Sequence, residues 1–179
     1  MFIMSAYYIA GSNGTGKSTV GKVLQSRGFR VIETDFEQGL SGWFDIDTNV
    51  RIEASKMPIQ PYSPQWVKSH GWMWNTDCMQ RLLASVGDEP VFFCGGATNA
   101  DVFYKSFSKR FGLYVQDVNI LKTRLKAREP ERWTDDSSEL TKSLMRAANS
   151  QEYFLANDII PIDSSRSPDS VADSILAQI

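Results

Sequence analysis

The sequence contains few residues of several types, and each shortage excludes a class of protein. Two cysteines among 179 residues are too few for a disulfide framework, and a single histidine, His70, excludes a histidine-based metal site. The net charge of -2 does not suggest the basic face of a dedicated nucleic-acid-binding protein. No apolar run approaches the roughly 18 residues that a membrane helix needs. We therefore expect a cytoplasmic protein whose partners include neither nucleic acid nor a membrane.

The rest of the composition is that of an ordinary globular domain. Hydrophobic residues make up 42% and charged residues 22% of the chain, and the length fits one domain over residues 1–179. Short apolar runs alternate with segments of helical period. The predicted strands cover 6–10, 29–33, 91–94, 112–116 and 159–162, and the predicted helices cover 17–27, 74–86, 101–109, 117–128 and 138–156, with a last one after 167. This alternation predicts an α/β fold, a three-layer α/β/α sandwich around a five-stranded parallel sheet.

An uninterrupted phosphate-binding motif follows the first predicted strand. Residues 11–18 read G-S-N-G-T-G-K-S and match the pattern G-x-x-x-x-G-K-S. Glycines let successive backbone N–H groups point at one centre, and the following helix N-terminus favours phosphates. Lys17 can reach the β- and γ-phosphates of ATP, and the Ser18 hydroxyl is a hard oxygen ligand for Mg²⁺. The predicted nucleotide-binding residues of this segment are Gly11, Ser12, Asn13, Gly14, Thr15, Gly16, Lys17, Ser18 and Thr19.

Missing motifs narrow the class of nucleotide-binding protein. The N-K-x-D and D-x-x-G motifs of a Ras-type GTPase do not occur. The predicted strand at 91–94 is followed by Gly95 and Gly96, without the carboxylate of a Walker B strand. With the phosphate loop and Glu33-Thr34-Asp35, this pattern resembles the nucleoside and nucleotide kinase group of P-loop proteins. The most similar branch is that of the shikimate and gluconate kinases.

This resemblance implies a fold, an activity and site residues. It implies a parallel sheet in the order 2-3-1-4-5, a lid at about 129–137, and transfer of the γ-phosphoryl of ATP to a small acceptor. Glu33-Thr34-Asp35 stands where shikimate kinases have Asp-x-Asp, and Gly95 and Gly96 stand where they have three glycines. The arginines that resemble the family's nucleotide-binding, lid and acceptor-binding positions are Arg124, Arg128, Arg132, Arg166 and Arg146.

Asp35 is the candidate catalytic carboxylate. It follows the second predicted strand, and open α/β sheets bind ligands at the carboxyl ends of their strands. There it can hold Mg²⁺ through water, orient an acceptor hydroxyl or accept its proton. The alternative is a turn residue or helix cap at the strand exit. Glu33 is a further acceptor-binding candidate, or a side chain that faces solvent.

Residues 36–71 form a long aromatic insertion where related kinases fold over the acceptor. Four of the five tryptophans lie in or just after it: Trp43, Trp66, Trp72 and Trp74. Their rings could line an acceptor pocket, for which we select Trp72 and Trp74, or form a satellite core. Two interpretations are also open for the arginines near the lid. Arg124 and Arg128 share a helix face, which either contacts phosphate or faces solvent.

These features predict an ATP- and Mg²⁺-dependent small-molecule kinase. The predicted catalytic residues are Lys17, Asp35, Arg128 and Arg132, and the metal would be held by Ser18 and Asp35. The predicted acceptor-binding residues are Glu33, Asp35, Trp72, Trp74, Gly95, Gly96 and Arg146. The alternative is a nucleotide-binding ATPase or regulatory module without phosphotransfer. The acceptor and the oligomeric state stay open.

Overall fold

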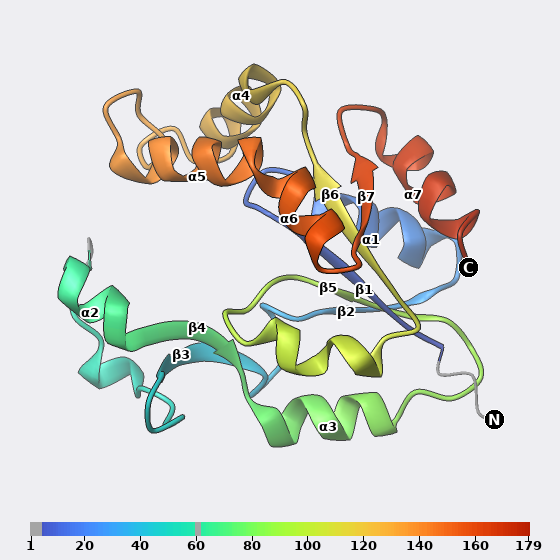
Figure 1. Cartoon of the computed structure of the whole chain (residues 1–179), viewed down its shortest axis with the longest axis horizontal. Helices are drawn as coiled ribbons and strands as arrows, with labels where there is room; N and C mark the ends of the chain where they lie inside the picture. The colour runs from blue at the N-terminus through green and yellow to red at the C-terminus, as the bar shows by residue number, and fades with distance from the viewer. Residues whose placement is uncertain (1–4, 60–61) are drawn as a thin grey trace.

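The computed structural model, which describes residues 5–59 and 62–179, is built around a five-stranded parallel sheet (Figure 1). Its strands are β1 Ala6–Gly11, β2 Arg30–Glu33, β5 Val91–Cys94, β6 Lys109–Tyr114 and β7 Ile160–Asp163. Their order is β2-β5-β1-β6-β7, and every neighbouring pair is parallel. Counted along the chain within this sheet, the order is 2-3-1-4-5, so the predicted fold class is confirmed. Residues 1–4 and 60–61 of the predicted domain lie outside the described residues.

Side chains of the central strand alternate between two hydrophobic clusters. Tyr7 and Ile9 belong to one cluster, and Tyr8 and Ala10 belong to the other. This period of two is what a strand buried on both faces requires, because successive side chains point to opposite sides of the sheet. The sheet therefore has an apolar core on each face, and each core needs a layer of helices to cover it.

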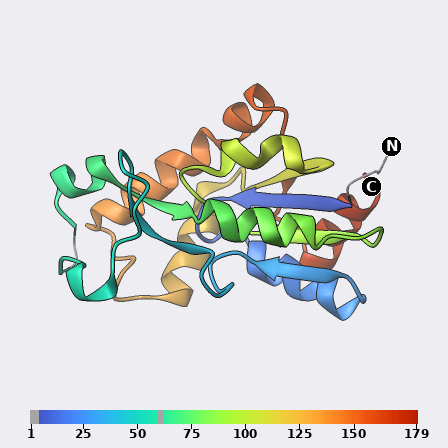
Figure 2. The same cartoon turned by 90° about the horizontal axis from the view of Figure 1, so that it is seen from below.

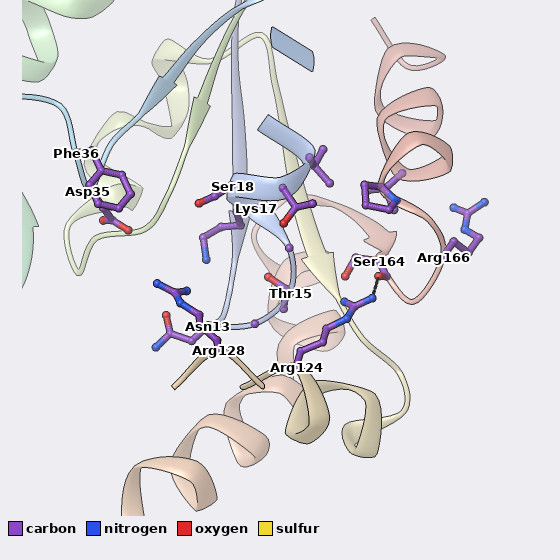
Figure 3. A pocket seen from close by; sticks show the side chains of 16 residues that line it. Asn13, Thr15, Lys17, Ser18, Asp35, Phe36, Arg124, Arg128, Ser164 and Arg166 are labelled. Atoms are coloured by element: carbon purple, nitrogen blue, oxygen red, sulfur yellow. Dashed lines mark hydrogen bonds between the residues drawn. The ribbon is translucent and has the colours of Figure 1, made fainter. Parts of the chain in front are cut away.

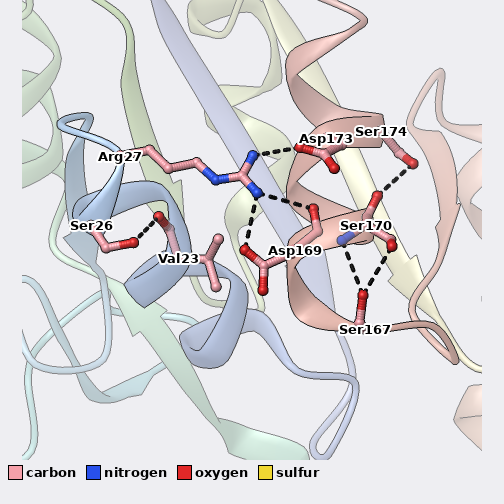
Figure 4. Close-up of polar contacts among 8 residues, drawn as sticks. All are labelled: Val23, Ser26, Arg27, Ser167, Asp169, Ser170, Asp173 and Ser174. Carbon is pink, nitrogen blue, oxygen red and sulfur yellow. Dashed lines mark hydrogen bonds and ion pairs between the residues drawn. The ribbon is translucent and has the colours of Figure 1, made fainter.

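Helices cover both faces (Figure 2). On one side lie α1 Lys17–Ser26 and α7 Pro168–Leu176, and on the other lie α3 Thr76–Ala84, the 3₁₀ helix η2 Ala100–Ser106 and α6 Ser150–Ala156. The guanidinium of Arg27, just after α1, forms ion pairs with Asp169 at 3.1 Å and Asp173 at 2.6 Å (Figure 4). These contacts join α1 to α7. No helix among the described residues is long and apolar enough to cross a membrane.

Further elements lie toward one end of the molecule. Helices α4 Val118–Arg128 and α5 Ser138–Ala148 pack through a third apolar cluster. A two-stranded antiparallel sheet of β3 Ser41–Asp45 and β4 His70–Trp74, with η1 Ala54–Lys56 and α2 Pro64–Ser69 between its strands, forms a separate unit that we call the arm (Figure 1). Figure 1 places the arm and α5 at the same end of the molecule.

Several predicted elements differ from those observed. The insertion contains the paired strands β3 and β4, which its irregular pattern does not predict. Residues 101–109 are not one helix, because η2 ends at Ser106 and β6 begins at Lys109. The predicted helix over 138–156 is broken at Asn149, whose side chain donates a hydrogen bond to the carbonyl of Met145 at 3.2 Å. Side-chain bonding of this kind ends a helix by competing with its backbone hydrogen bonds.

Gly112 in β6 allows α6 to pack closely on the sheet, which gives a stability prediction. A Cβ at Gly112 would lie 2.4 Å from the ring of Phe154, which is only 4% exposed. We expect Gly112→Ala to lower the free energy of unfolding by about 1–3 kcal/mol, since a buried ring has little room to move. Denaturant unfolding measures this loss. Gly87→Ala is the control, because nothing lies within 4 Å of the added Cβ. Equal losses in the two variants would contradict the packing account.

Candidate functional site

The phosphate loop runs from the end of β1 into the first turn of α1. Gly14 has a φ of 80° and Gly16 a φ of 96°, values that glycine adopts without strain. The Lys17 ammonium donates hydrogen bonds to the carbonyl oxygens of Gly11 at 2.8 Å and Ser12 at 3.1 Å. Burial lowers the pKa of Lys17 below the ordinary lysine value, and the Asp35 carboxylate opposes that shift. The loop therefore holds its lysine at the carboxyl end of the sheet.

Glu33 lies beside the start of α1. The Ser18 hydroxyl donates to Oε2 of Glu33 at 3.0 Å. A Cβ at Gly21 would lie 2.8 Å from Oε1 of the same carboxylate, so this glycine leaves room for it. The intervening Thr34 is buried and packs against Gly95. The structure thus brings Glu33, rather than Asp35, within hydrogen-bond distance of Ser18.

Asp35 contacts the arm. Its Oδ1 accepts a hydrogen bond from the indole nitrogen of Trp72 in β4 at 3.1 Å. The next residue, Phe36, is a large apolar side chain that is 79% exposed. Figure 3 shows Asp35 and Phe36 on one side of Lys17, with Arg124, Ser164 and Arg166 on the other side. Asp35 therefore lies between the phosphate loop and the arm.

One cavity, which we call the first cavity, surrounds the phosphate loop. It measures about 370 Å³ and continues past the loop to Arg124, Ser164 and Arg166 (Figure 3). Arg124 donates to the Ser164 carbonyl at 2.9 Å, which holds its guanidinium at the cavity wall. Arg128 and Val171 also line this cavity. It combines backbone N–H groups, cations and an apolar end, as a nucleotide site does.

Another cavity, which we call the second cavity, lies between the arm and α5. It measures about 730 Å³, with Trp43, Tyr62 and Trp72 from the arm on its wall. Its other lining residues include Gly96, Arg132, Trp133, Glu139, Lys142, Ser143 and Arg146. Asn13, Lys17, Asp35 and Phe36 line both cavities. The two cavities therefore meet at Lys17 and Asp35.

The segment 129–137 lies against α4 and α5. Trp133 is 2% exposed and belongs to the third apolar cluster. Arg132 forms ion pairs with Glu129 at 3.3 Å and Glu139 at 2.7 Å, and its guanidinium lies over the Trp133 ring. Lys122 and Lys126 contact Asp135 and lower the pKa of that carboxyl to about 2. In this arrangement the segment completes the wall of the second cavity.

Most of the predicted site residues come together at the two cavities. Residues 13–19 of the loop line the first cavity together with Asp35, Arg124, Arg128 and Arg166. The second cavity is lined by Gly11, Ser12, Trp72, Gly96, Arg132 and Arg146. Trp74 is a correction: it is fully buried and packs edge-on against Tyr8, with ring centroids 5.5 Å apart. The end of β4 enters the hydrophobic core, where Asn99 forms two hydrogen bonds with the backbone of Trp74. Gly95 is also buried and lines neither cavity.

Several residues of the second cavity are not among the predicted ones. Phe36, Trp43 and Tyr62 lie in the insertion, whose fold has no local sequence signal. The residues on α5 do have a local sequence signal, because Glu139, Lys142 and Ser143 are spaced to share one helix face with the predicted Arg146. That spacing could have identified them.

Comparison with known proteins supports the fold. No family model and no curated protein matches the sequence. A gluconokinase from Sinorhizobium meliloti 1021 aligns over 99% of this chain and 92% of its own, at 15% identity and a TM-score of 0.53. A shikimate kinase from Aquifex aeolicus vf5 aligns over 97% of this chain and 94% of its own, at 16% identity and a TM-score of 0.55. A deoxyadenosine kinase from M. mycoides with bound dATP aligns over 97% of this chain and 98% of its own, at 12% identity and a TM-score of 0.54. The chain therefore shares the fold of these three kinases, as the resemblance in its sequence implies.

Proposed function

We propose that this chain is a cytoplasmic kinase that transfers the γ-phosphoryl of ATP to a hydroxyl or phosphate of a small acceptor. The observation that carries the proposal is the meeting of two cavities at Lys17 and Asp35. Phosphoryl transfer between two bound molecules needs two adjoining sites with the reacting groups at their junction. The names of the structural neighbours, a gluconokinase, a shikimate kinase and a deoxyadenosine kinase, support this reaction class.

ATP would occupy the first cavity. The loop N–H groups and Lys17 would hold its phosphates, and Arg124 and Arg128 would neutralise charge on them. The base would lie toward Ser164, Arg166 and Val171, where the cavity becomes more apolar. A guanidinium stabilises the charge that spreads over the phosphoryl oxygens during transfer. We therefore keep Arg128 and Arg132 as the candidate catalytic arginines, one on each cavity.

The residues beside the loop fit Mg²⁺. Ser18 and Glu33 offer hard oxygen atoms 3.0 Å apart, next to the place for the phosphates. Mg²⁺ usually takes only one or two protein ligands and keeps water and phosphate oxygens, so a larger acidic cluster is not required. When bound, the ion would neutralise charge on the β- and γ-phosphate oxygens. Asp35 would act on the ion only through water.

Asp35 would serve the acceptor. Trp72 donates to its Oδ1, which leaves Oδ2 to accept a hydrogen bond from the acceptor hydroxyl. In this position the carboxylate orients the hydroxyl oxygen and takes its proton as the new P–O bond forms. Trp72 is then a positioning residue for Asp35 as well as part of the cavity wall.

Trp72→Phe tests the hydrogen bond to Asp35, because it removes the indole N–H and keeps an aromatic ring in the cavity wall. We expect kcat to fall about 10- to 100-fold with little change in the KM for ATP, because a hydrogen bond to a charged group contributes about 1.5–3 kcal/mol. Trp66→Phe is the matched control. It lies in the same aromatic cluster, 4.8 Å from Trp43 between ring centroids, but contacts neither Asp35 nor a cavity. Equal kcat values in the two variants would remove the positioning role.

A nucleotide-binding module without phosphotransfer is the second candidate. The observation in its favour is that β5 ends at Cys94 and is followed by Gly95 and Gly96, without a carboxylate. Glu33 beside Ser18 supplies a carboxylate from a neighbouring strand instead. ATP turnover measured with and without pooled nucleosides, sugars, polyols and cyclitols distinguishes the two. We expect a pool that stimulates turnover, and a rate that no pool raises would favour the binding module.

A further inference from the structure

The wall of the second cavity formed by α5 has unbalanced positive charge. Glu139 is paired with Arg132 at 2.7 Å, so these two charges compensate each other. Among the described residues, neither Lys142 nor Arg146 has an ion-pair or hydrogen-bond partner. Both lie on the face of α5 that lines the cavity. Two unpaired cations on one cavity wall favour an anionic ligand.

Ser143 lies between these two cations in the sequence and shares their helix face. It is only 8% exposed and lines the cavity. Within residues 5–59 and 62–179 its hydroxyl has no hydrogen-bond partner. The hydroxyl oxygen is not among the fully buried unpartnered atoms, so it is accessible to a ligand in the cavity. It could therefore donate a hydrogen bond to a carboxylate or phosphate oxygen held between Lys142 and Arg146.

The opposite wall is aromatic. Trp43 packs edge-on against Tyr62 and Trp72, with ring centroids 5.2 Å and 6.0 Å away. All three side chains remain partly exposed and line the cavity. Phe36, 79% exposed, stands at the junction with the first cavity. Exposed aromatic surface of this extent is suited to packing against a flat ring.

We propose that the acceptor is an aromatic alcohol with a carboxylate or phosphate group. Its ring would pack on Trp43, Tyr62 and Trp72, and its anion would bind Lys142, Ser143 and Arg146. Its hydroxyl would reach the junction at Asp35. This inference rests on the proposed kinase function and names the substrate class of the same site. Gluconate and shikimate, which appear in the names of two structural neighbours, have no aromatic ring and should bind less tightly.

Four matched compounds test the two halves of the proposal. They are 4-(hydroxymethyl)benzoate, 4-(hydroxymethyl)phenyl phosphate, the uncharged 4-(hydroxymethyl)benzamide and the non-aromatic 4-(hydroxymethyl)cyclohexanecarboxylate. Binding is measured by calorimetry or ligand NMR at millimolar concentrations, with a non-hydrolysable ATP analogue in the first cavity. At least one aromatic anion should bind about 10- to 100-fold more tightly than the benzamide. The benzoate should bind about two- to tenfold more tightly than the cyclohexane compound.

Variants on α5 locate the binding. Lys142→Gln and Arg146→Gln should each remove most of the preference for anion over amide, because both cations are exposed and their loss leaves the helix intact. Lys105→Gln is the control, since Lys105 lies in η2 and lines neither cavity. The compounds carrying carboxylate and phosphate distinguish which anion the wall prefers. An unchanged preference in both α5 variants would overturn the assignment to this wall.

The outcomes separate this inference from the proposed function. If the ATP analogue binds but neither aromatic anion binds, or the benzamide binds equally well, the substrate class is wrong while the kinase proposal stands. Equal binding of the benzoate and the cyclohexane compound removes the aromatic half. If an aromatic anion binds at α5 but ATP never transfers phosphoryl to its hydroxymethyl group, the ligand class holds and that compound is not the acceptor. Transfer to none of the acceptor pools contradicts the proposed function itself.

Discussion

Lys17→Ala is expected to abolish ATP binding. The ammonium lies within the phosphate loop, 2.8 Å from the Gly11 carbonyl, and is the loop's only charged donor. A phosphate in the first cavity would replace these carbonyls as its partner. Each charge-assisted hydrogen bond contributes about 1.5–3 kcal/mol, so losing two or more should weaken binding by at least about 100-fold. Calorimetric titration with ATP and Mg²⁺ measures the effect.

Lys22→Ala provides the matched control. Lys22 lies on the same helix, is exposed and lines neither cavity, so ATP affinity should be unchanged. Denaturant unfolding of both variants checks that the loss is one of binding rather than folding. Wild-type ATP affinity in Lys17→Ala would show that nucleotide does not bind at the loop.

Asp35→Asn is expected to reduce turnover far more than nucleotide affinity. The change keeps the side chain's size and its acceptor for Trp72 but removes the charge that attracts an acceptor proton. General-base assistance is worth roughly 100- to 10,000-fold in rate, so kcat should fall by a factor in that range. ATP affinity should change little, because Lys17, Ser18 and the loop N–H groups remain. Steady-state kinetics with the acceptor that stimulates turnover, together with calorimetry, measure both quantities.

Asp47→Asn controls for the loss of one negative charge near the arm. Asp47 is exposed in the turn after β3 and lines neither cavity, so kinetic values should match the wild type. Near-normal kcat in Asp35→Asn would transfer the catalytic role to another group. Glu33→Gln would then be the next variant, because Glu33 is the other carboxylate at this end of β2.

The central sheet could be predicted because its signals are local. Strands β1 and β5 are short apolar runs with glycine at their carboxyl ends, and the phosphate loop follows β1. Strand β6 begins earlier than predicted, at Lys109, since polar residues hide its start. Arg110 there donates to the Asp158 carbonyl at 3.0 Å, a contact that only the tertiary fold creates. The arm could not be predicted, because Ser41 pairs with Trp74 across a long stretch of irregular sequence.

The candidate site likewise has a part that a local sequence motif predicts and a part that depends on tertiary packing. The phosphate loop is one uninterrupted motif, whereas the second cavity joins side chains from the arm, the 129–137 segment and α5. Trp72 and Trp74 look alike in the sequence, yet one lines the cavity and the other is buried in the core. Their difference depends on where β4 enters the body of the molecule. Pairwise contacts such as Trp72 with Asp35 likewise follow from tertiary packing rather than from local pattern.

The most direct test of phosphoryl transfer follows the γ-phosphoryl group itself. ATP labelled at the γ-phosphorus is incubated with Mg²⁺, the wild-type protein and pools of nucleosides, sugars, polyols, cyclitols and aromatic hydroxy acids. The products are then separated by chromatography. The proposed function predicts label in an organic phosphate from one pool, and none in that product with Lys17→Ala. Label found only in ATP and inorganic phosphate, with ATP still bound by the wild-type protein, would contradict it.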